Sequence, residues 1–540
     1  MDILFIIASS AYLLWITRNI LFWVSLWQLK EYRFDRMLIH LKETGQGREL
    51  LFSPLSLLKI ILIVGYVFVV FNDDLSGPYQ LAIVGLYLFQ ALLVLRENFS
   101  NLAKKPVFTA KAIFLIICAF LITLSFFAIP LLDKYLWLLL IDKILTIIIG
   151  FIVLVLAFPT EIHRDVQIDK AVKKLKERKD LLVIGVTGSY GKSSTKDYLA
   201  QILASRFSTL KTHGTNNTPI GIAKTILDQL DKTIKIFVVE MGAYKRGEIS
   251  SMCKIVHPKI GILTAVNDQH LSLFKTIENT KKAKYELIES LPKNGLALFN
   301  GNNAITATMF TQTKKPKVLY TTSTAHTSQK TDQKQSKIIT AYNIGVKKNE
   351  LLFDVDIDGE TLHLRTHLLG AHNIENILPG VYVAKHLGMK TGQIQDAVSR
   401  LKSLPKTMIR YVLSNGVTIV DDTFNANPEA VVAALSYIKV YTKKRILVLQ
   451  PMIELGKRAK DEHYRVAKEI SKTCDHLFLT NGNFYSSIMK GIHDGKGKCI
   501  VEVGNANTIA EYLQNHAKKD DVIIFEGKEA AYVMDKVLEK

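Results

Sequence analysis

Residues 181–199 read LLVIGVTGSYGKSSTKDYL, and this stretch predicts the fold of the region around it. The apolar run 181–186 predicts a buried strand, and a turn of small residues, 187–191, follows it. Lys192 then begins a stretch with helical apolar spacing. A strand, a glycine turn and a helix N-terminus form an anion site, because the backbone N–H groups of the turn and the helix dipole both favour negative charge.

The same stretch is typical of a phosphate-binding loop. Lys192 adds a point charge, and Ser193 occupies the position whose hydroxyl binds Mg²⁺ in GxxxxGK[ST] loops. The match is imperfect, since Val186 stands at the place of the first glycine. A strand–turn–helix that binds no phosphate is the alternative. We predict a nucleotide site with contacts from Thr187, Gly188, Ser189, Gly191, Lys192, Ser193 and Ser194.

Length and charge narrow the class of protein. The chain has 540 residues, which predicts several domains, and a formal net charge of +20. Such a charge favours nucleic acid or an anionic membrane as partner. Because long apolar segments are also present, we favour the membrane and anionic substrates and expect no nucleic-acid partner. The four cysteines show no metal-ligand or CxxC spacing, so a disulfide framework is not expected.

The first 158 residues contain five apolar segments, most of them near the roughly 20 residues that span a bilayer. They are residues 3–28, 55–71, 79–95, 110–131 and 135–158. Arg18 interrupts the first segment, which is alternatively a signal anchor, and no small-residue cleavage site follows it. We therefore predict a multi-pass membrane domain over residues 1–158.

The charge of the connecting loops predicts the orientation. The connection after the first segment carries Lys30, Arg33, Arg36, Lys42 and Arg48, and the one after the third carries Arg96, Lys104 and Lys105. Between the second and third segments, residues 72–74 contain no basic residue. The positive-inside rule then predicts an N-terminus outside the cell and everything after Pro159 in the cytoplasm, at the cell membrane.

The rest of the chain predicts α/β structure. Residues 159–180 form a basic, helix-patterned linker that we expect near anionic headgroups. Strands and helices then alternate through two predicted α/β domains, 181–404 and 405–540. Residues 338–369 alternate like a small antiparallel meander with a turn at Asp358 and Gly359. The strands of the two domains are predicted at 236–240, 260–266 and 296–300, and at 417–420, 445–449, 476–479 and 522–525.

Six stretches, in order along the chain, resemble motifs of the Mur ligase family. Three are shared by that family: 187–194 (TGSYGKSS), 212–221 (THGTNNTPIG) and 267–271 (NDQHL). Three resemble its MurF branch, the UDP-N-acetylmuramoyl-tripeptide–D-alanyl-D-alanine ligases: 240–243 (EMGA) with 247–249 (GEI), 421–428 (DDTFNANP) and 452–456 (MIELG). The resemblance implies a central ATP-binding domain and a Rossmann-like C-terminal domain. It covers roughly residue 181 to the C-terminus.

The resemblance also implies a reaction, ATP-dependent formation of an amide through an acyl phosphate. Cations must bring the carboxylate and the triphosphate together, and Lys192 and Mg²⁺ fill that role. By resemblance, Ser193 and Glu240 hold this Mg²⁺, and His270 serves a second one. Lys284 aligns with a lysine that the family carries as a carbamate. Lys192, Lys284 and His270 are therefore the predicted catalytic residues.

Other predicted contacts come from the same resemblance. Asn300 matches an adenine-side asparagine, and Arg410, Asp422 and Asn425 are predicted to reach the nucleotide from the C-terminal domain. Several of these residues have a structural alternative. Glu240 is alternatively a helix cap, His270 an ordinary turn histidine and Lys284 part of a solvated helix face. Residues 370–373 with Asn376 match the stretch that closes the central domain of the family, and His372 and Asn373 alternatively only tie that turn together.

The departures from the family pattern fall on the substrate side. Membrane segments replace the UDP-sugar-binding domain, and residues 450–452 and 526–528 differ from the MurF pattern. We expect a MurF-like ligase in cell-wall peptide synthesis, with a cell-envelope acceptor that is lipid-linked in one interpretation, and a dipeptide or amino acid as amine. The alternatives are a membrane-bound polyglutamate- or cyanophycin-type ligase and, from another class, a non-catalytic nucleotide sensor.

Overall fold

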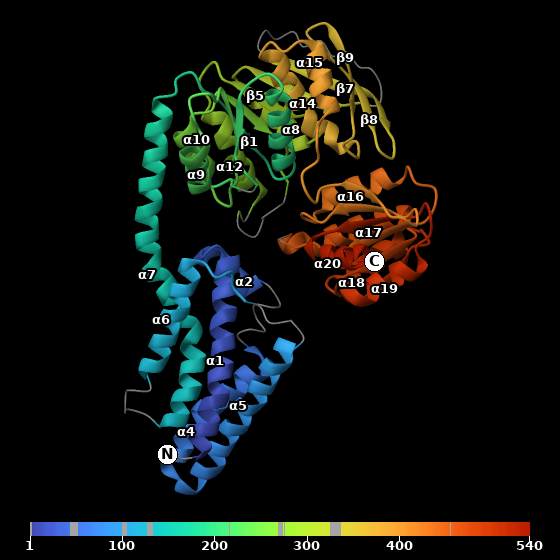
Figure 1. The fold of residues 1–540 in the computed structure, drawn as a ribbon. Coiled ribbons are helices and arrows are strands. Elements are labelled where there is room, and N and C mark those ends of the chain that lie inside the picture. Colours follow the sequence, from blue (N-terminus) through green and yellow to red (C-terminus); the bar gives the residue numbers. More distant parts are fainter. Residues whose placement is uncertain are drawn as a thin grey trace. The chain divides into compact units, whose positions relative to one another are not determined.

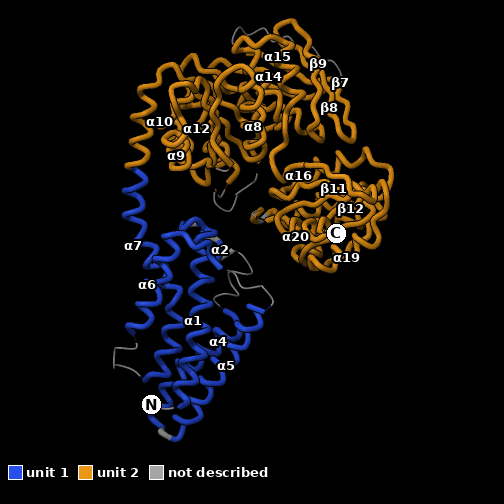
Figure 2. The backbone as a smooth tube through the Cα atoms, viewed as in Figure 1, with its two compact units in different colours: residues 1–165 blue, residues 166–540 orange. Residues whose placement is uncertain are grey.

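The computed structural model describes residues 3–43, 52–99, 105–126, 133–214, 216–267, 274, 276–323, 336–453 and 455–539. The chain divides into two compact units, Met1–Asp165 and Val166–Lys540 (Figure 2). The first unit is helical, and the second contains two β-sheets with helices on both faces. This division agrees with the predicted fold class, apolar helices followed by two α/β domains.

Unit 1 consists of apolar helices at all five predicted positions. They are α1 (Ile3–Leu29), α4 (Pro54–Phe71), α5 (Ser76–Phe99), α6 (Ala110–Phe126) and α7 (Lys134–Lys176), and the short α2 (Phe34–Glu43) follows α1. Among the described residues, α1, α4, α5 and α7 are long and apolar enough to cross a membrane, whereas α6 has 17 residues. These four helices indicate multi-pass membrane anchoring.

The interior and the outside of unit 1 are both apolar. Side chains such as Ile20 and Ile149 are fully buried between the helices, while Phe68 and Ile147 keep 67% and 71% of their surface exposed. An apolar outer surface of this kind is costly in water and suits contact with lipid. The packing of unit 1 therefore supports the membrane assignment independently of helix length.

Helix α7 joins the two units in sequence. The predicted fifth segment and the predicted basic linker form one continuous helix that passes through Pro159. Proline removes one intrahelical hydrogen bond, but strong helix formers continue on both sides and the helix persists. Its last turns belong to unit 2, where Ala171 is buried in the core of the first α/β domain.

The first α/β domain of unit 2 is built on a nine-stranded sheet in the order β2-β3-β1-β4-β5-β6-β7-β8-β9 (Figure 1). The strands are β1 (Leu182–Thr187), β2 (Thr209–Lys211), β3 (Ile236–Glu240), β4 (Ile260–Leu263), β5 (Leu296–Asn300), β6 (Lys317–Thr322), β7 (Ser336–Val346), β8 (Leu351–Ile357) and β9 (Glu360–Thr366). The predicted meander is β7-β8-β9. It extends the same sheet as β1, because β7 pairs with β6 in parallel.

Helices cover both faces of this sheet. The helices of the domain are α8 (Lys192–Ala204), α9 (Pro219–Gln229), α10 (Glu248–Val256), α12 (Ile277–Glu289), α13 (Ala304–Gln312), α14 (His372–His386) and α15 (Thr391–Ser399). Strand side chains alternate between the two faces: Ile184 and Val186 of β1 join the core with α8, α14 and α15, and Val183 joins the core with α9, α10 and α12.

The C-terminal domain contains a six-stranded sheet in the order β10-β11-β15-β12-β13-β14, parallel except for β10. The strands are β10 (Ile409–Val412), β11 (Thr418–Asp422), β12 (Arg445–Leu449), β13 (His476–Leu479), β14 (Ile500–Val503) and β15 (Val522–Glu526). The helices are α16 (Pro428–Ile438), α17 (Ala459–Thr473), α18 (Tyr485–Asp494), α19 (Ala506–His516) and α20 (Lys528–Leu538). The carboxyl ends of its parallel strands, like those of the first sheet, are where open α/β sheets bind ligands.

Candidate active site

A cavity of 640 Å³ lies in unit 2 and has walls from both domains. The residues that follow β1, β4 and β5 and the start of α14 line one side, and residues around the start of α16 line the other. Of the predicted site residues, the cavity wall includes Ser189, Gly191, Lys192, Ser193, Ser194, Asn300, Asp422 and Asn425. Residue 270 lies outside the described residues, so the structure places no side chain for His270.

The turn after β1 requires glycine at Gly188. Its φ is +154°, and a Cβ atom there would lie 2.0 Å from Oγ1 of Thr264. The Thr264 hydroxyl donates to the Tyr190 carbonyl at 2.5 Å, and the Ser189 N–H donates to the Ala265 carbonyl at 2.7 Å. The loop is therefore held against the carboxyl end of β4, which fixes its shape for a ligand.

The start of α8 suits a phosphate group. Its N-cap is Gly191, with φ of +77° and no side-chain cap, so the first N–H groups of the helix remain available. The Lys192 ammonium donates to the Ser189 carbonyl at 2.8 Å. Burial lowers the pKa of Lys192, and the charge of Glu240 opposes that shift. A cradle of this shape beside a lysine fits the phosphates of ATP.

A buried ion pair lies beside this loop. The Lys196 ammonium and the Glu240 carboxylate are 3.0 Å apart, with 2% and 1% of their side chains exposed. Asn217 donates to the other oxygen of Glu240 at 3.1 Å. The sequence analysis did not single out Lys196, although its position one helical turn after Lys192 on α8 was an available signal.

The residues predicted to hold Mg²⁺ lie on neighbouring elements. Ser193 lines the cavity in the first turn of α8, and Glu240 ends β3, the strand that pairs with β1. Each Glu240 oxygen accepts one hydrogen bond and retains a second lone pair. Because phosphate-bound Mg²⁺ takes most of its ligands from phosphates and water, one hydroxyl and one carboxylate fit this ion.

Lys284 is buried on α12, with 3% of its surface exposed. Burial lowers the pKa of its amine well below the usual range, and the charge of Lys192 lowers it further. The ring of Phe274 lies 5.8 Å from the amine. The location contradicts a solvated helix face, and an uncharged amine is the form that reacts with CO₂.

Polar side chains connect Asn300 to α14. The Asn300 amide donates to Glu375 at 2.7 Å, and the Asn302 amide donates to the other Glu375 oxygen at 2.8 Å. Sequence reasoning did not single out Glu375, and no local pattern marks it. The Asn373 amide donates to the Leu369 carbonyl at 2.8 Å. This contact lies within one turn, as the structural alternative for Asn373 predicts. Burial lowers the pKa of the neighbouring His372 to about 4.

The C-terminal domain contributes acidic groups. Asp422 and Glu526 end adjacent parallel strands and occupy paired positions. Burial raises the pKa of both carboxyls, that of Asp422 to about 7, and the charge of Asp422 raises the pKa of Glu526 further. Arg410, predicted to reach the nucleotide, donates to the Tyr441 hydroxyl at 3.2 Å and is absent from the described cavity wall. Arg465 lines the cavity instead and pairs with Glu462 at 2.8 Å.

Two protein-family models match the two domains that form this cavity. Residues 186–384 match the Mur ligase middle domain, and residues 408–529 match the Mur ligase glutamate ligase domain. This region belongs to the Mur ligase family. Mur ligases are ATP-dependent acid–amino-acid ligases, so the chain is an enzyme of that class. Neither match extends to residues 1–185, which contain the apolar helices.

Individual relatives support the MurF branch at low identity. The UDP-N-acetylmuramoyl-tripeptide–D-alanyl-D-alanine ligase of Bacillus subtilis is 28% identical over 354 residues, 64% of this chain and 72% of that protein. The Synechocystis enzyme of the same name is 31% identical over 315 residues. The alignment covers 56% of this chain and 63% of that enzyme. The crystal structure of MurF ligase from Thermotoga maritima in complex with ADP aligns with a TM-score of 0.59 at 25% identity, covering 70% of this chain and 82% of that one.

Proposed function

We propose that this Mur ligase joins an amino acid or dipeptide to the carboxylate of a cell-envelope precursor, as a MurF-like ligase in cell-wall peptide synthesis. One observation carries the proposal: a single cavity joins the phosphate loop and Lys192 to Asp422 and Asn425 of the C-terminal domain. A ligase needs such a cleft, because ATP and two further reactants must meet in one place.

The proposed reaction has two steps. An oxygen of the acceptor carboxylate attacks the γ-phosphorus of ATP, and ADP leaves with the electrons of the broken P–O bond. The nitrogen of the amine then attacks the acyl carbon, phosphate leaves, the nitrogen loses its proton to solvent and an amide remains. Lys192 stabilises the charge of the transferring phosphoryl group, and the loop of Gly188 and Gly191 positions it.

Metal ions support these steps in the same proposal. Ser193 and Glu240 hold one Mg²⁺, and Lys284 as a carbamate holds a second together with His270. When bound, these ions neutralise phosphate charge and bring the carboxylate and the triphosphate together. Burial supports the role of Lys284, because it lowers the pKa of the amine and so favours the uncharged form that takes up CO₂.

The acceptor in this proposal is presented at the membrane, as a lipid-linked precursor. Helices long enough to cross a bilayer precede the ligase domains, and the chain has a net charge of +20 that favours anionic lipids. The catalytic unit lies in the cytoplasm, where ATP is. A cysteine introduced at Ser76 then reacts with an impermeant reagent added outside, and one at Gly47, outside the described residues, does not. The reverse labelling pattern would overturn this orientation.

Phosphate release from ATP tests the function. Full-length protein is supplied with a UDP-linked or lipid-linked acceptor peptide and with D-alanyl-D-alanine, L-glutamate or L-aspartate. Turnover with D-alanyl-D-alanine supports the MurF-like function, and turnover with glutamate or aspartate alone identifies a poly-amino-acid ligase instead. ATP binding without phosphate release under any of these conditions would indicate a nucleotide sensor and refute the proposal.

A truncated protein tests the presentation of the acceptor. Residues 170–540 contain both ligase domains and their hydrophobic cores. We expect this fragment to lose activity on the lipid-linked acceptor. If it shows full activity on the soluble acceptor, the helices of unit 1 act as a tether and the membrane-presented substrate is ruled out.

A further inference from the structure

Unit 1 contains a polar cavity of 490 Å³ among its apolar helices. Residues of α1, α4, α5 and α7, together with His40 of α2, line it. Ionisable side chains within membrane helices are costly and generally serve a function. A cavity of this size is also typical of small-molecule and headgroup sites.

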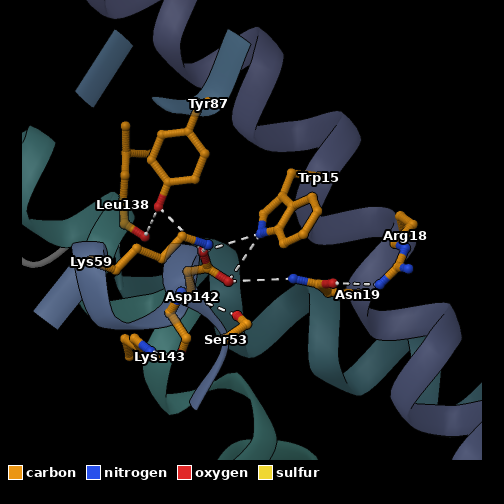
Figure 3. Close-up of polar contacts among 10 residues, drawn as sticks. Trp15, Arg18, Asn19, Ser53, Lys59, Tyr87, Leu138, Asp142 and Lys143 are labelled. Atoms are coloured by element: carbon orange, nitrogen blue, oxygen red, sulfur yellow. Dashed lines mark hydrogen bonds and ion pairs between the residues drawn. The ribbon is translucent and has the colours of Figure 1, made fainter. Parts of the chain in front are cut away.

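A closed ion pair forms one wall of the cavity. Lys59 of α4 contacts Asp142 of α7, and each side chain is 5% exposed. Trp15 of α1 donates to both Asp142 oxygens at 3.2 and 3.1 Å, and Asn19 donates to one of them at 3.3 Å. Figure 3 shows these groups converging on the carboxylate. Both oxygens of Asp142 therefore have hydrogen-bond or ion-pair partners, and the cluster links α1, α4 and α7. We do not infer a cation site at this carboxylate.

The remaining charge on the cavity wall is positive. The described wall contains the basic side chains Arg18, His40, Lys59 and Lys143 and one acidic side chain, Asp142. Arg18 is paired with Glu97 of α5 through two contacts of 2.9 Å. Of the arginine and the two lysines on the described wall, Lys143 of α7 is the one not paired with a carboxylate, and its hydrogen bond goes to the neutral hydroxyl of Ser56. Among the described residues no carboxylate lies within ion-pair distance of Lys143.

Gln90 of α5 provides a second, independent observation. Its side chain lines the cavity and is 0% exposed, and neither its amide nitrogen nor its amide oxygen has a hydrogen-bond partner within the described ranges. A buried amide without partners is destabilising, so a ligand is the simplest source of its hydrogen bonds. An ammonium and an amide N–H on one wall are both donors, which suits an anionic oxygen ligand.

We propose that this cavity binds the phosphate headgroup of a membrane lipid, with Lys143 and Gln90 as its polar ligands. The apolar side chains of Phe22, Leu26 and Leu55 on the same wall suit the first carbons of a lipid chain. The Lys59–Asp142 pair holds the helices in place and is not a ligand. The phosphate site does not depend on the proposed ligase function. The statement that this lipid is also the carrier of the acceptor peptide does depend on it.

Tryptophan fluorescence of the full-length protein is a direct probe of this site. All four tryptophans, Trp15, Trp23, Trp27 and Trp137, are in unit 1, and Trp15 and Trp23 line the cavity. The protein in detergent is titrated with dioleoyl phosphatidic acid, with dioleoylglycerol, which has the same chains without phosphate, and with inorganic pyrophosphate. We expect a saturable change with phosphatidic acid alone. An equal response to dioleoylglycerol would overturn the phosphate site, and equal affinity for pyrophosphate would overturn the lipid as its source.

Two variants locate the binding site. Lys143→Gln is expected to weaken binding of phosphatidic acid about tenfold, the loss of one charged hydrogen bond. Lys134→Gln on the same helix is the control and leaves binding unchanged, since Lys134 is not part of the described cavity wall. Gln90→Leu weakens binding without lowering the melting temperature, a combination that a purely structural role would not produce. Wild-type affinity in both Lys143→Gln and Gln90→Leu would refute the proposal.

The two proposals fail separately. A protein that binds phosphatidic acid but releases no phosphate from ATP with any acceptor refutes the proposed function and supports this site. A protein that ligates a soluble acceptor but shows no lipid response refutes the site and leaves the ligase function intact.

Discussion

The two α/β domains of unit 2 differ in the ionisable groups that lie near the carboxyl ends of their parallel strands. In the first domain Lys192 follows β1 in the phosphate loop, and the buried Lys196–Glu240 ion pair lies beside it. At the strand ends of the second lie Asp421, Asp422 and Glu526, each at least 92% buried. Carboxyl ends of parallel strands bind ligands in both cases, but the Lys192 ammonium complements a phosphate chain, whereas the carboxyls of the second domain suit a hydrogen-bond donor such as an amine. Of these groups Lys192 and Asp422 line the described cavity, one from each domain, so the basic and the acidic contribution to the cleft come from different sheets.

The largest expected effect comes from the basic side of this comparison. Lys192→Ala should abolish ligation, because its charge stabilises the transferring phosphoryl group, and groups of this kind commonly supply about 10²–10³ in rate. Phosphate release in the presence of acceptor and amine measures it, with the exposed Lys254→Ala on α10 as control. Turnover within about tenfold of wild type would contradict the assigned role.

Lys284 tests whether a buried lysine acts as a cation or as a carboxylate precursor. Lys284→Ala should be inactive, and acetate or formate in solution should restore part of the activity by supplying the missing oxygen ligand. Lys282→Ala, exposed on the same helix, should behave like wild type. An active Lys284→Arg protein would rule out the carbamate, because a guanidinium cannot take up CO₂ to supply that ligand.

At Lys196 we expect an effect on stability rather than on chemistry. Lys196→Met leaves the Glu240 carboxylate buried without its partner, which typically costs about 3–5 kcal/mol. Urea unfolding of the variant measures this loss. Adding Glu240→Gln should recover part of it, since the stranded charge is then gone. Equal stability of Lys196→Met and wild type would show that the pair is energetically unimportant.

The acidic side of the comparison predicts a pH dependence. A carboxyl whose pKa is raised by folding stabilises the protein at low pH, and this contribution is lost as the pH rises through the folded value. For Asp422 the loss begins above about pH 4 and continues through about pH 7, and for Glu526, whose pKa burial raises well above its usual range, the loss has the same direction. It amounts to at most about 1.4 kcal/mol per pH unit for each proton released.

Glu526→Gln removes one of the two carboxyls. Its melting temperature should therefore fall less than that of wild type between pH 5.5 and 8.5, because one fewer buried proton is released. Glu511→Gln, exposed on α19, is a control for a carboxylate outside the pair. Parallel melting curves for Glu526→Gln and wild type over this range would show that the pair does not titrate as described.

Much of the fold could be predicted because its signals are local. The predicted strands 236–240, 296–300, 445–449 and 476–479 coincide with β3, β5, β12 and β13, since each is a short apolar run with polar neighbours. The pairing of β7 with β6, which extends the nine-stranded sheet, was not predictable in this way, because strand pairing depends on residues distant in sequence. Pro159 likewise suggested a boundary, whereas α7 continues through it.

The site was predictable where a motif is continuous in sequence. The loop from Gly188 to Ser194 needed no tertiary information, since its glycines, lysine and serine are consecutive. The pairing of Asp422 with Glu526 depends on the register of β11 against β15, and the contact of Arg410 with Tyr441 depends on how β10 packs. Neither contact leaves a signal in the local sequence.

The Lys196–Glu240 pair has a consequence for the history of the protein. Each single replacement leaves an uncompensated charge in a site that is almost closed to water, so a lineage that loses one partner first becomes less stable. The two positions are expected to change together or not at all among related chains. They would therefore appear as a covarying pair in a family alignment, although neither residue lines the described cavity.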